Sequence, residues 1–280
     1  MKFYKCHGAG NDFVIIDSDP SLKNVKLGEF AKALCDRRHG IGGNGLLILE
    51  ESQRADVRMR IFNPDGSEAE MCGNGIRCFA KYAYDKGVVK HKDMEIETLA
   101  GVKRVSLLDD NIVEVELGRP EFERKRIPAI GDGKFLEEQL EGLTVSAVNL
   151  GVPHAVVFAG ELDSIDVYNL GRKIRTSQVF PKGANVNFLE STGENTFRIR
   201  TYERGVEDET YACGTGISAS AAVAVALGRA DPNEPITIEA CGGRFSVKVN
   251  VEDGEITGVR LRGPVSFVFE GEVELEDLLR

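Results

Sequence analysis

The sequence predicts an α+β protein of two pseudo-symmetric domains that arose by internal duplication, each a curved mixed sheet around a central buried helix. Two observations support this prediction. Equivalent residues recur with a separation of 141 positions, as at Cys72 and Cys213. Short β-branched runs also alternate with two helices that are apolar on nearly every side. A repeat of this length indicates two halves and not a solenoid.

Glycine-containing segments carry the repeat along each half. The segment GNDFVIID pairs with GVPHAVVF, and GGNGLLIL pairs with GANVNFLE, which aligns Asn44 with Asn185. A Gly-X-Pro or Gly-Pro sequence then closes each copy. We therefore expect an N-terminal domain over 1–118, completed by 265–280, and a C-terminal domain over 119–264. The aligned glycines are Gly10 and Gly151, Gly42 and Gly183, Gly87 and Gly228, and Gly101 and Gly242.

The strands and helices follow from local patterns. The runs DFVIID, GLLILE, DVRMRIF, HAVVF and RFSVKVNV are typical of strands. The segment from Leu27 to Gly40 has helical spacing, and Gly40 is predicted to end it as a glycine C-cap. The segments GIRCFAKYAYDKG and GISASAAVAVALG predict one helix in each half. Because both are apolar almost all round, we expect them to be buried inside the sheets.

Composition excludes several classes of function. A hydrophobic content of 42% and a charged content of 29% are typical of a globular protein in water. The net charge of −10 argues against a nucleic-acid partner, which would favour a basic surface. No apolar run is long enough for a membrane span, and MKFYKCHGAGNDF does not predict a secretory signal.

Cysteine and histidine usage bears on compartment and cofactors. Six cysteines without a predicted targeting segment indicate reduced thiols and a cytoplasmic location. None of the cysteines forms a CxxC pair, and the chain has only four histidines, so no metal site is expected.

The segments EMCGNGIRCFA and YACGTGISASA place a cysteine and a glycine turn at the start of each buried helix. A helix N-terminus presents unpaired N–H groups and about half a positive charge. Glycines let those amides approach an anion closely. The two anions that benefit are a substrate carboxylate and a cysteine thiolate. The motif therefore predicts a carboxylate site beside a reactive thiol.

Two such thiols suggest stereoinversion without a cofactor. A thiolate could remove the α-hydrogen from one face of an amino acid, and a thiol could return a proton to the other face. The amides around the carboxylate would stabilise the charge that develops at the α-carbon. A duplicated fold supplies one acid–base group for each face.

Six segments together identify a family: KCHGAGNDFVIID, GIGGNGLL, FNPDGSEAEMCGNGIRCFA, GVPHAVVF, GANVNF and YERGVEDETYACGTGISASA. Along essentially its whole length the sequence resembles the diaminopimelate epimerases. The resemblance implies an isomerase that interconverts LL- and meso-diaminopimelate in lysine biosynthesis without pyridoxal phosphate or another cofactor. It also implies the diaminopimelate epimerase-like fold, with the last strand returning to the first domain, and often a homodimer.

The same resemblance assigns roles to individual residues. Cys72 and Cys213 match the two proton-transfer thiols. His154 and Glu203 match catalytic-site residues that hold the α-ammonium and adjust thiol ionisation, and Arg204 suits a distal carboxylate because a guanidinium holds it through two parallel bonds. The full set of substrate-binding matches is Asn11, Asn63, Gly73, Asn74, Asn185, Glu203, Arg204, Gly214 and Thr215.

The chain departs from the family pattern at two places. Val152 stands where many relatives carry a substrate-contacting asparagine. Asn44 replaces a common aspartate, and Gly45 follows it where some relatives have glutamine. The first departure puts recognition of the distal end of the substrate in question, and neither affects the two thiols.

Two alternatives compete with the epimerase hypothesis. One is a two-thiol racemase of another amino acid, and the other is a non-catalytic redox-switch protein in which the two cysteines form a disulfide. Arg204 and the asparagines favour diaminopimelate, because a redox protein does not need them.

The remaining cysteines and charged runs are expected to be structural. We interpret Cys6, Cys35, Cys78 and Cys241 as buried apolar residues. The runs KHKD and FERKRIP are interpreted as solvated surface. His7, His39 and His91 receive no functional role.

Overall fold

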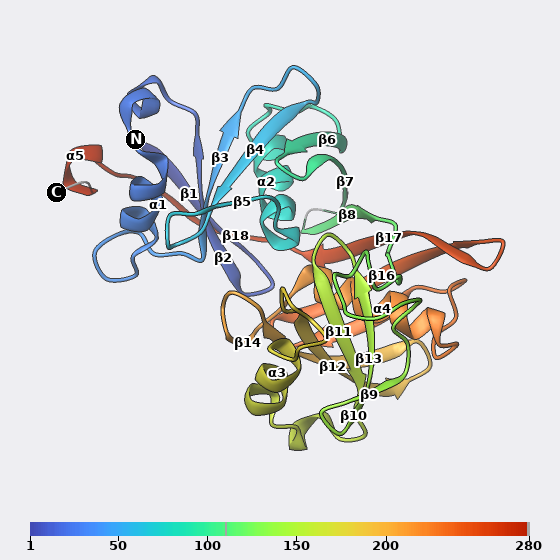
Figure 1. Ribbon diagram of the computed structural model, residues 1–280. Helices are drawn as coiled ribbons and strands as arrows, with labels where there is room; N and C mark the ends of the chain where they lie inside the picture. Colours follow the sequence, from blue (N-terminus) through green and yellow to red (C-terminus); the bar gives the residue numbers. More distant parts are fainter. Residues whose placement is uncertain (110, 279–280) are drawn as a thin grey trace. The chain divides into compact units, whose positions relative to one another are not determined.

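Two separate chain segments build one unit of the protein, and a single segment builds the other (Figure 1). In the computed structural model, which describes residues 1–109 and 111–278, unit 1 comprises Met1–Val115 and Gly263–Arg280. Unit 2 comprises Glu116–Arg262. Within the described residues, no helix is long and apolar enough to cross a membrane.

The sheet of unit 1 mixes parallel and antiparallel strands. Its order is β18, β1, β2, β3, β4, β6, β7 and β8, with the short β5 pairing with β4. The β2–β3 and β4–β6 pairs are parallel, and the others are antiparallel. The C-terminal strand β18 therefore returns to pair with the first strand of the chain. The strands are β1 (Lys2–Gly8), β2 (Asn11–Asp17), β3 (Gly45–Glu50), β4 (Val57–Phe62), β5 (Glu68–Ala69), β6 (Asp93–Thr98), β7 (Gly101–Asp109), β8 (Ile112–Gly118) and β18 (Ser266–Glu272).

Unit 2 repeats this topology strand for strand. Its order is β9, β10, β11, β12, β13, β15, β16 and β17, with the short β14 on β13. The parallel pairs, β11–β12 and β13–β15, occupy the equivalent positions. The strands are β9 (Glu138–Leu140), β10 (Leu143–Asn149), β11 (Pro153–Phe158), β12 (Asn185–Gly193), β13 (Thr196–Glu203), β14 (Asp208–Thr210), β15 (Ile236–Ala240), β16 (Gly243–Glu252) and β17 (Glu255–Pro264).

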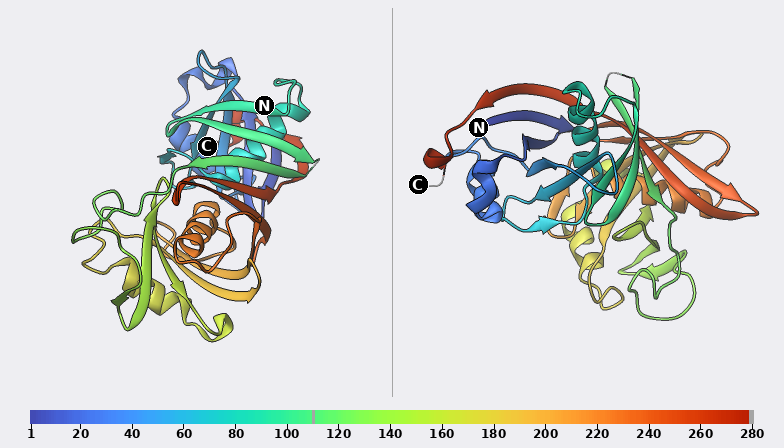
Figure 2. Two further views of the ribbon diagram at one scale, coloured as in Figure 1. Left: turned by 90° about the vertical axis from the view of Figure 1, so that its right-hand side faces the viewer. Right: turned by 90° about the horizontal axis from the view of Figure 1, so that it is seen from above.

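Each unit encloses one central helix. In unit 1, α2 (Gly73–Asp85) packs against β1, β2, β3, β4 and β7. In unit 2, α4 (Gly214–Ala226) packs against β10, β11, β12, β15 and β16, and Figure 2 shows strands of that unit surrounding it. Both helices are followed by a glycine with positive φ, Gly87 at 71° and Gly228 at 66°, which L side chains rarely adopt. The predicted α+β class, with its duplication and buried helices, is confirmed.

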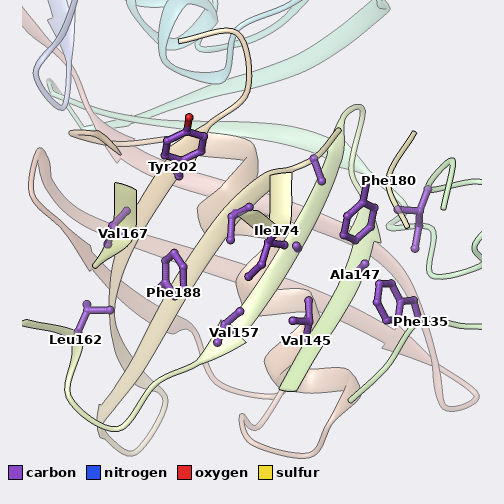
Figure 3. Close-up of a cluster of buried hydrophobic side chains, with 14 residues drawn as sticks. Phe135, Val145, Ala147, Val157, Leu162, Val167, Ile174, Phe180, Phe188 and Tyr202 are labelled. Atoms are coloured by element: carbon purple, nitrogen blue, oxygen red, sulfur yellow. The ribbon is translucent and has the colours of Figure 1, made fainter. Parts of the chain in front are cut away.

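A second helix covers the opposite face of each sheet, and a cluster of buried apolar side chains lies beneath it. In unit 1 this helix is α1 (Leu27–Cys35), which packs on β3 and β4. In unit 2 it is α3 (Val167–Arg175), which packs on β12 and β13. Figure 3 shows the unit 2 core, where Ile174 lies over Val157 and Phe188 of the sheet. The short elements are η1 (Pro20–Asn24), η2 (Leu162–Ser164) and α5 (Leu275–Leu278).

The predicted end of the first helix at Gly40 is wrong. The helix α1 ends at Cys35, because Asp36 takes an extended ψ of 125° and its Oδ1 accepts the N–H groups of Arg38 and His39, each at 2.7 Å. This side-chain turn competes with continued helix. Gly40 still packs closely on the helix end, since a Cβ there would lie 2.1 Å from the Ala33 carbonyl oxygen.

Two further interpretations also need correction. The run FERKRIP is not solvated throughout, because Arg124 is buried and its Nη1 donates to the Ile130 carbonyl at 2.6 Å. Its guanidinium pairs with the Glu138 carboxylate and lies 4.4 Å from the centre of the Phe135 ring, and both contacts compensate for burial of the charge. Cys241 is exposed, since it lies in the turn between β15 and β16, whereas Cys6, Cys35 and Cys78 are buried as predicted.

Candidate active site

Cys72 is the N-cap residue of α2. Its backbone is extended, with φ −137° and ψ 123°, and its Sγ accepts the backbone N–H of Gly75 at 3.5 Å. The first turn of the helix is the predicted Gly73-Asn74 segment, and both residues are buried. A thiol in this position lies at the positive end of the helix dipole, which favours its ionised form.

A buried arginine, which the sequence analysis did not assign, anchors this first turn. Arg77 is fully buried, and its Nη1 donates to the Gly73 carbonyl at 2.9 Å. Its Nη2 donates to Asn74 Oδ1 at 2.8 Å. These bonds fix the side chain of Asn74 and the carbonyl of the residue that follows Cys72. A single arginine in the apolar segment GIRCFA was the available sequence signal.

Cys213 is the N-cap residue of α4 and repeats the arrangement in unit 2. Its φ is −107° and its ψ is 106°, and the residue is buried. Its Sγ lies 3.5 Å from Thr215 Oγ1, so the predicted Thr215 contacts the thiol directly. The sequence therefore predicted correctly that both cysteines precede a helix and that glycines form its first turn.

His154 lies on β11 in a fully buried polar network of unit 2. The network depends on Asn187 of β12, another residue that the sequence analysis missed. Asn187 Nδ2 donates to the Ala155 carbonyl at 3.0 Å and lies 3.2 Å from His154 Nδ1, and its Oδ1 accepts from Thr201 Oγ1 at 3.0 Å. The alternation of polar and apolar residues in NVNF was too common a pattern to mark Asn187.

The network determines the tautomer of His154. A carbonyl oxygen can only accept, so the group of Asn187 that faces Ala155 is the NH₂ group. His154 Nδ1 therefore accepts, and Nε2 carries the proton. Burial, and secondarily the charge of Arg204, lower the pKa of His154 to about 3, so the imidazole is neutral. Its buried Nε2 has no hydrogen-bond partner among residues 1–109 and 111–278.

Asn187 also touches the first turn of α4. A Cβ added at Gly216 would lie 2.3 Å from Asn187 Oδ1. Since real Cβ atoms do not approach an oxygen so closely, only glycine fits at this position without displacing the amide. The glycine of the motif CGTG is thus required by packing against a polar side chain.

Glu203 is the last residue of β13 and Arg204 follows it, beside this network. Burial raises the pKa of the Glu203 carboxyl, while the Thr210 hydroxyl, which donates to Glu203 Oε2 at 2.9 Å, opposes that shift. Arg204 Nη1 donates to the carbonyls of Lys182 and Gly183, at 3.0 and 3.2 Å. One edge of the guanidinium is therefore anchored to backbone.

Asn185 and Val152 complete the predicted positions of unit 2. Asn185 is buried, and its Oδ1 accepts the backbone N–H of Arg204 at 2.8 Å, which orients its NH₂ group away from that strand. Val152 is partly exposed in the turn before β11, and its carbonyl accepts from Leu150 N–H at 3.2 Å.

In unit 1, Asn11 is oriented by a chain of polar contacts. Arg37 Nη2 donates to Asn44 Oδ1 at 2.8 Å, and Asn44 Nδ2 donates to Asn11 Oδ1 at 3.0 Å. The same Arg37 forms two bonds to Asp12, which also pairs with the buried Lys5 at 2.7 Å. Because Arg37 can only donate, it fixes the amide of Asn44, and Asn11 presents its NH₂ group.

Asn63 has the opposite polarity. It lies in the turn after β4, where its Nδ2 donates to Ser67 Oγ at 3.0 Å, so its Oδ1 is the group that can accept from a ligand. Unit 1 thus carries Cys72, Gly73, Asn74, Asn11 and Asn63.

Unit 2 carries the other predicted site residues, and the structure groups several of them locally. The charge of Arg204 acts on His154, and Asn185 bonds to the backbone of Arg204. The full set in unit 2 is Cys213, Gly214, Thr215, His154, Asn185, Glu203 and Arg204. The described residues contain no group of three or more His, Cys, Asp or Glu side chains that could hold a metal ion.

The fold defines the class of protein. The structure superposes on a PhzF-family phenazine biosynthesis protein from Bacillus anthracis with a TM-score of 0.69 and 20% identity, covering 98% of this chain and 99% of that one. It superposes on a probable proline racemase from Agrobacterium radiobacter with a TM-score of 0.70 and 17% identity, and the match covers 98% of this chain and 93% of that one. At such identities the match concerns the fold, which is that of the duplicated α+β proteins with two central helices.

Sequence comparison then identifies the family. The diaminopimelate epimerase family model matches residues 3–123 and 146–268. The diaminopimelate epimerase of Methanocella arvoryzae is 45% identical over 281 residues, which cover 99% of this chain and 98% of the relative. That of Methanothrix thermoacetophila is 47% identical over 274 residues, covering 95% and 96%. The chain belongs to the diaminopimelate epimerase family.

Proposed function

We propose that this protein is a cofactor-independent isomerase that interconverts LL- and meso-diaminopimelate in lysine biosynthesis. The observation that carries the proposal is the pair of buried helices that begin directly after Cys72 and Cys213, in a chain of this family. Each helix offers N–H groups for a carboxylate and lowers the cost of ionising its cysteine.

The chemistry is a proton transfer through two thiols. One cysteine thiolate takes the α-hydrogen and becomes a thiol, while the other thiol returns a proton to the opposite face and becomes a thiolate. Amides at a helix N-terminus stabilise the negative charge that spreads from the α-carbon into the carboxylate. No group besides the two sulfurs gains or loses a proton over the step.

The residues of unit 2 have distinct proposed roles beside the reacting centre. His154 carries its proton on Nε2, so it donates to an anionic group and does not accept from an ammonium. Glu203 is the group that holds the α-ammonium, because an ionised carboxylate only accepts. The sequence resemblance suggested this role for both residues, and the tautomer of His154 favours Glu203 alone.

The distal end of diaminopimelate carries a carboxylate and an ammonium, and the polar residues match both. The distal carboxylate accepts hydrogen bonds from the guanidinium of Arg204 and from the NH₂ groups of Asn185 and Asn11. The distal ammonium donates to Asn63 Oδ1. Val152 supplies no polar contact from its side chain. A single neutral hydrogen bond contributes about 0.5–1.5 kcal/mol, so its loss does not outweigh a charge-assisted arginine pair.

The competing substrate hypothesis is tested by measuring kcat/KM for LL-diaminopimelate, lysine, glutamate and histidine in one buffer. We expect diaminopimelate to be the best of the four. A comparable value for any other amino acid would make the protein a racemase of that amino acid instead. Absence of deuterium incorporation from heavy water at the α-carbon of all four would leave the non-catalytic redox-switch hypothesis.

We further propose that the protein forms a homodimer and works in the cytoplasm. Strand β18 has three consecutive exposed apolar residues, Phe267, Val268 and Phe269. Their exposed fractions are 40%, 54% and 48%. Such a patch is typical of a protein–protein interface. Light scattering on the wild type and on Phe269→Ser tests this, with a dimer expected only for the wild type. The two catalytic thiols need a reducing compartment, which supports the cytoplasm.

A further inference from the structure

The two cysteine helices differ in charge at one buried position, five residues after each cysteine. Arg77 follows Cys72 by five residues and is fully buried, with its guanidinium on the Gly73 carbonyl and on Asn74 Oδ1. It packs closely, since a Cβ at Gly8 of β1 would lie 3.4 Å from Arg77 Nη2. A helical side chain is directed toward the N-terminus of its helix, so the charge lies over the first turn.

The equivalent residue of the other helix is neutral. Ser218 follows Cys213 by five residues, is fully buried, and donates from Oγ to the Gly214 carbonyl at 2.9 Å. Both side chains therefore bind the carbonyl of the residue after the cysteine. The repeat preserves this hydrogen bond, whereas Arg77 adds a charge and a second bond, to Asn74 Oδ1.

Arg77 remains a cation at neutral pH. Burial lowers its pKa to about 10, against the opposing effect of Cys78 and Cys72. Cys78 cannot be the compensating anion, because burial raises the pKa of its thiol well above the usual value. Ionised Cys72 can compensate the charge, and its Sγ also accepts the Gly75 N–H at 3.5 Å. Cys213 instead has the neutral hydroxyl of Thr215 at 3.5 Å.

We propose that Arg77 is a positioning residue that makes Cys72 the thiolate of the resting enzyme, while Cys213 rests as the thiol. This assignment rests on the proposed function, in which both sulfurs transfer protons. For the isomer whose α-hydrogen faces Cys72, the resting enzyme then abstracts that hydrogen with Cys72 and reprotonates with Cys213, and the opposite direction begins from the form in which Cys213 is ionised. The product form carries the proton on Cys72 and the charge on Cys213, and proton exchange with solvent restores the resting form.

The proposal predicts which thiol ionises first in the wild type. Iodoacetamide reacts with the thiolate, so the pH midpoint of alkylation of each cysteine, followed by peptide mass spectrometry, reports its ionisation. We expect a lower midpoint for Cys72 than for Cys213. A lower midpoint for Cys213 would overturn the proposal without any variant, so the test does not depend on folding of a mutant.

Variants test the role of the charge itself. In Arg77→Gln we expect the Cys72 midpoint to rise by about 1 to 2 pH units, within the range of about 1–3 units by which a nearby opposite charge shifts a pKa. Arg77→Lys keeps the charge and should recover at least half of this shift. The matched control, Ser218→Ala, should leave the Cys72 midpoint unchanged.

The decisive comparison is between the glutamine and lysine variants, with circular dichroism as the check on folding. A Cys72 midpoint in folded Arg77→Gln within about 0.3 units of the wild type refutes the electrostatic role. Equal shifts in the two variants would indicate packing and not charge, which also refutes it. Because alkylation needs no substrate, this failure is distinct from failure of the proposed function, which deuterium incorporation reports.

Discussion

Gly75 and Gly216 occupy the same position in the two cysteine helices, and replacing each by alanine should have opposite effects. In unit 2, the new Cβ would lie 2.3 Å from Asn187 Oδ1 and 3.3 Å from the Cys213 Cβ. In unit 1, its three nearest atoms would all lie at 3.4 Å, an ordinary contact. Neither glycine has a positive φ, so backbone conformation is not an obstacle in either case.

The magnitude follows from the bonds of Asn187. Its amide binds Ala155, His154 and Thr201, at 3.0, 3.2 and 3.0 Å. Displacing it leaves at least one buried group unsatisfied, which costs about 1–3 kcal/mol. Alanine recovers about 0.5–1 kcal/mol of helix propensity. We expect Gly216→Ala to lose up to about 2.5 kcal/mol of stability on balance, and Gly75→Ala to lose none and gain up to about 1 kcal/mol.

The assay is urea unfolding followed by circular dichroism, together with kcat/KM for LL-diaminopimelate. Gly216→Ala should show a lower urea midpoint than Gly75→Ala, and a lower kcat/KM than the wild type, since the tautomer of His154 depends on Asn187. Equal midpoints in the two variants, or full activity in Gly216→Ala, would refute the packing argument.

Three further predictions concern ionisation and specificity. Because burial lowers the pKa of His154 to about 3, its ring ¹⁵N chemical shifts should stay constant between pH 5 and 8 and show the proton on Nε2. A titration of this ring near neutral pH would contradict the buried network. Burial raises the pKa of Glu203, so activity that needs its carboxylate is lost as pH falls through a value above the ordinary 4.5. The acidic limb of the plot of kcat/KM against pH should therefore change in Glu203→Gln. An acidic limb identical to that of the wild type would exclude Glu203 as the group that titrates there. Lysine lacks the distal carboxylate and forfeits two charge-assisted bonds of about 1.5–3 kcal/mol each, so kcat/KM for lysine should be at least about a hundredfold lower. In Arg204→Met the kcat/KM values for diaminopimelate and lysine should become much closer. An unchanged preference for diaminopimelate would exclude Arg204 as the residue that binds the distal carboxylate.

The fold was predictable where local sequence determines local structure. The segments CGNG and CGTG, each followed by an apolar run, are sufficient to place two buried helices and their N-caps. The repeat then implies that both halves share one topology. The end of α1 was not predictable in this way. The helix ends before Gly40, because the Asp36 side chain accepts the N–H groups of Arg38 and His39 and forms a turn there.

The site was predictable for residues whose chemistry is visible in their neighbours along the chain. Asn187 and Arg77 were not predicted, because the groups that they bind are brought to them by the fold and are not marked by a sequence motif. Asn187 reaches His154 and Thr201 on two different strands. Arg77 is a cation in a segment predicted to be buried, but its bonds to the Gly73 carbonyl and to Asn74 are visible only in the structure. Burial, and not residue type, reveals the role of both side chains.

Alanine substitution of each cysteine tests the two-thiol mechanism most directly. Each substitution removes the base for one direction and the acid for the other. We therefore predict that Cys72→Ala and Cys213→Ala keep the wild-type circular dichroism spectrum and lose epimerisation of LL-diaminopimelate in both directions, as followed by chiral chromatography. Epimerase activity within tenfold of the wild type in either folded variant would contradict the account.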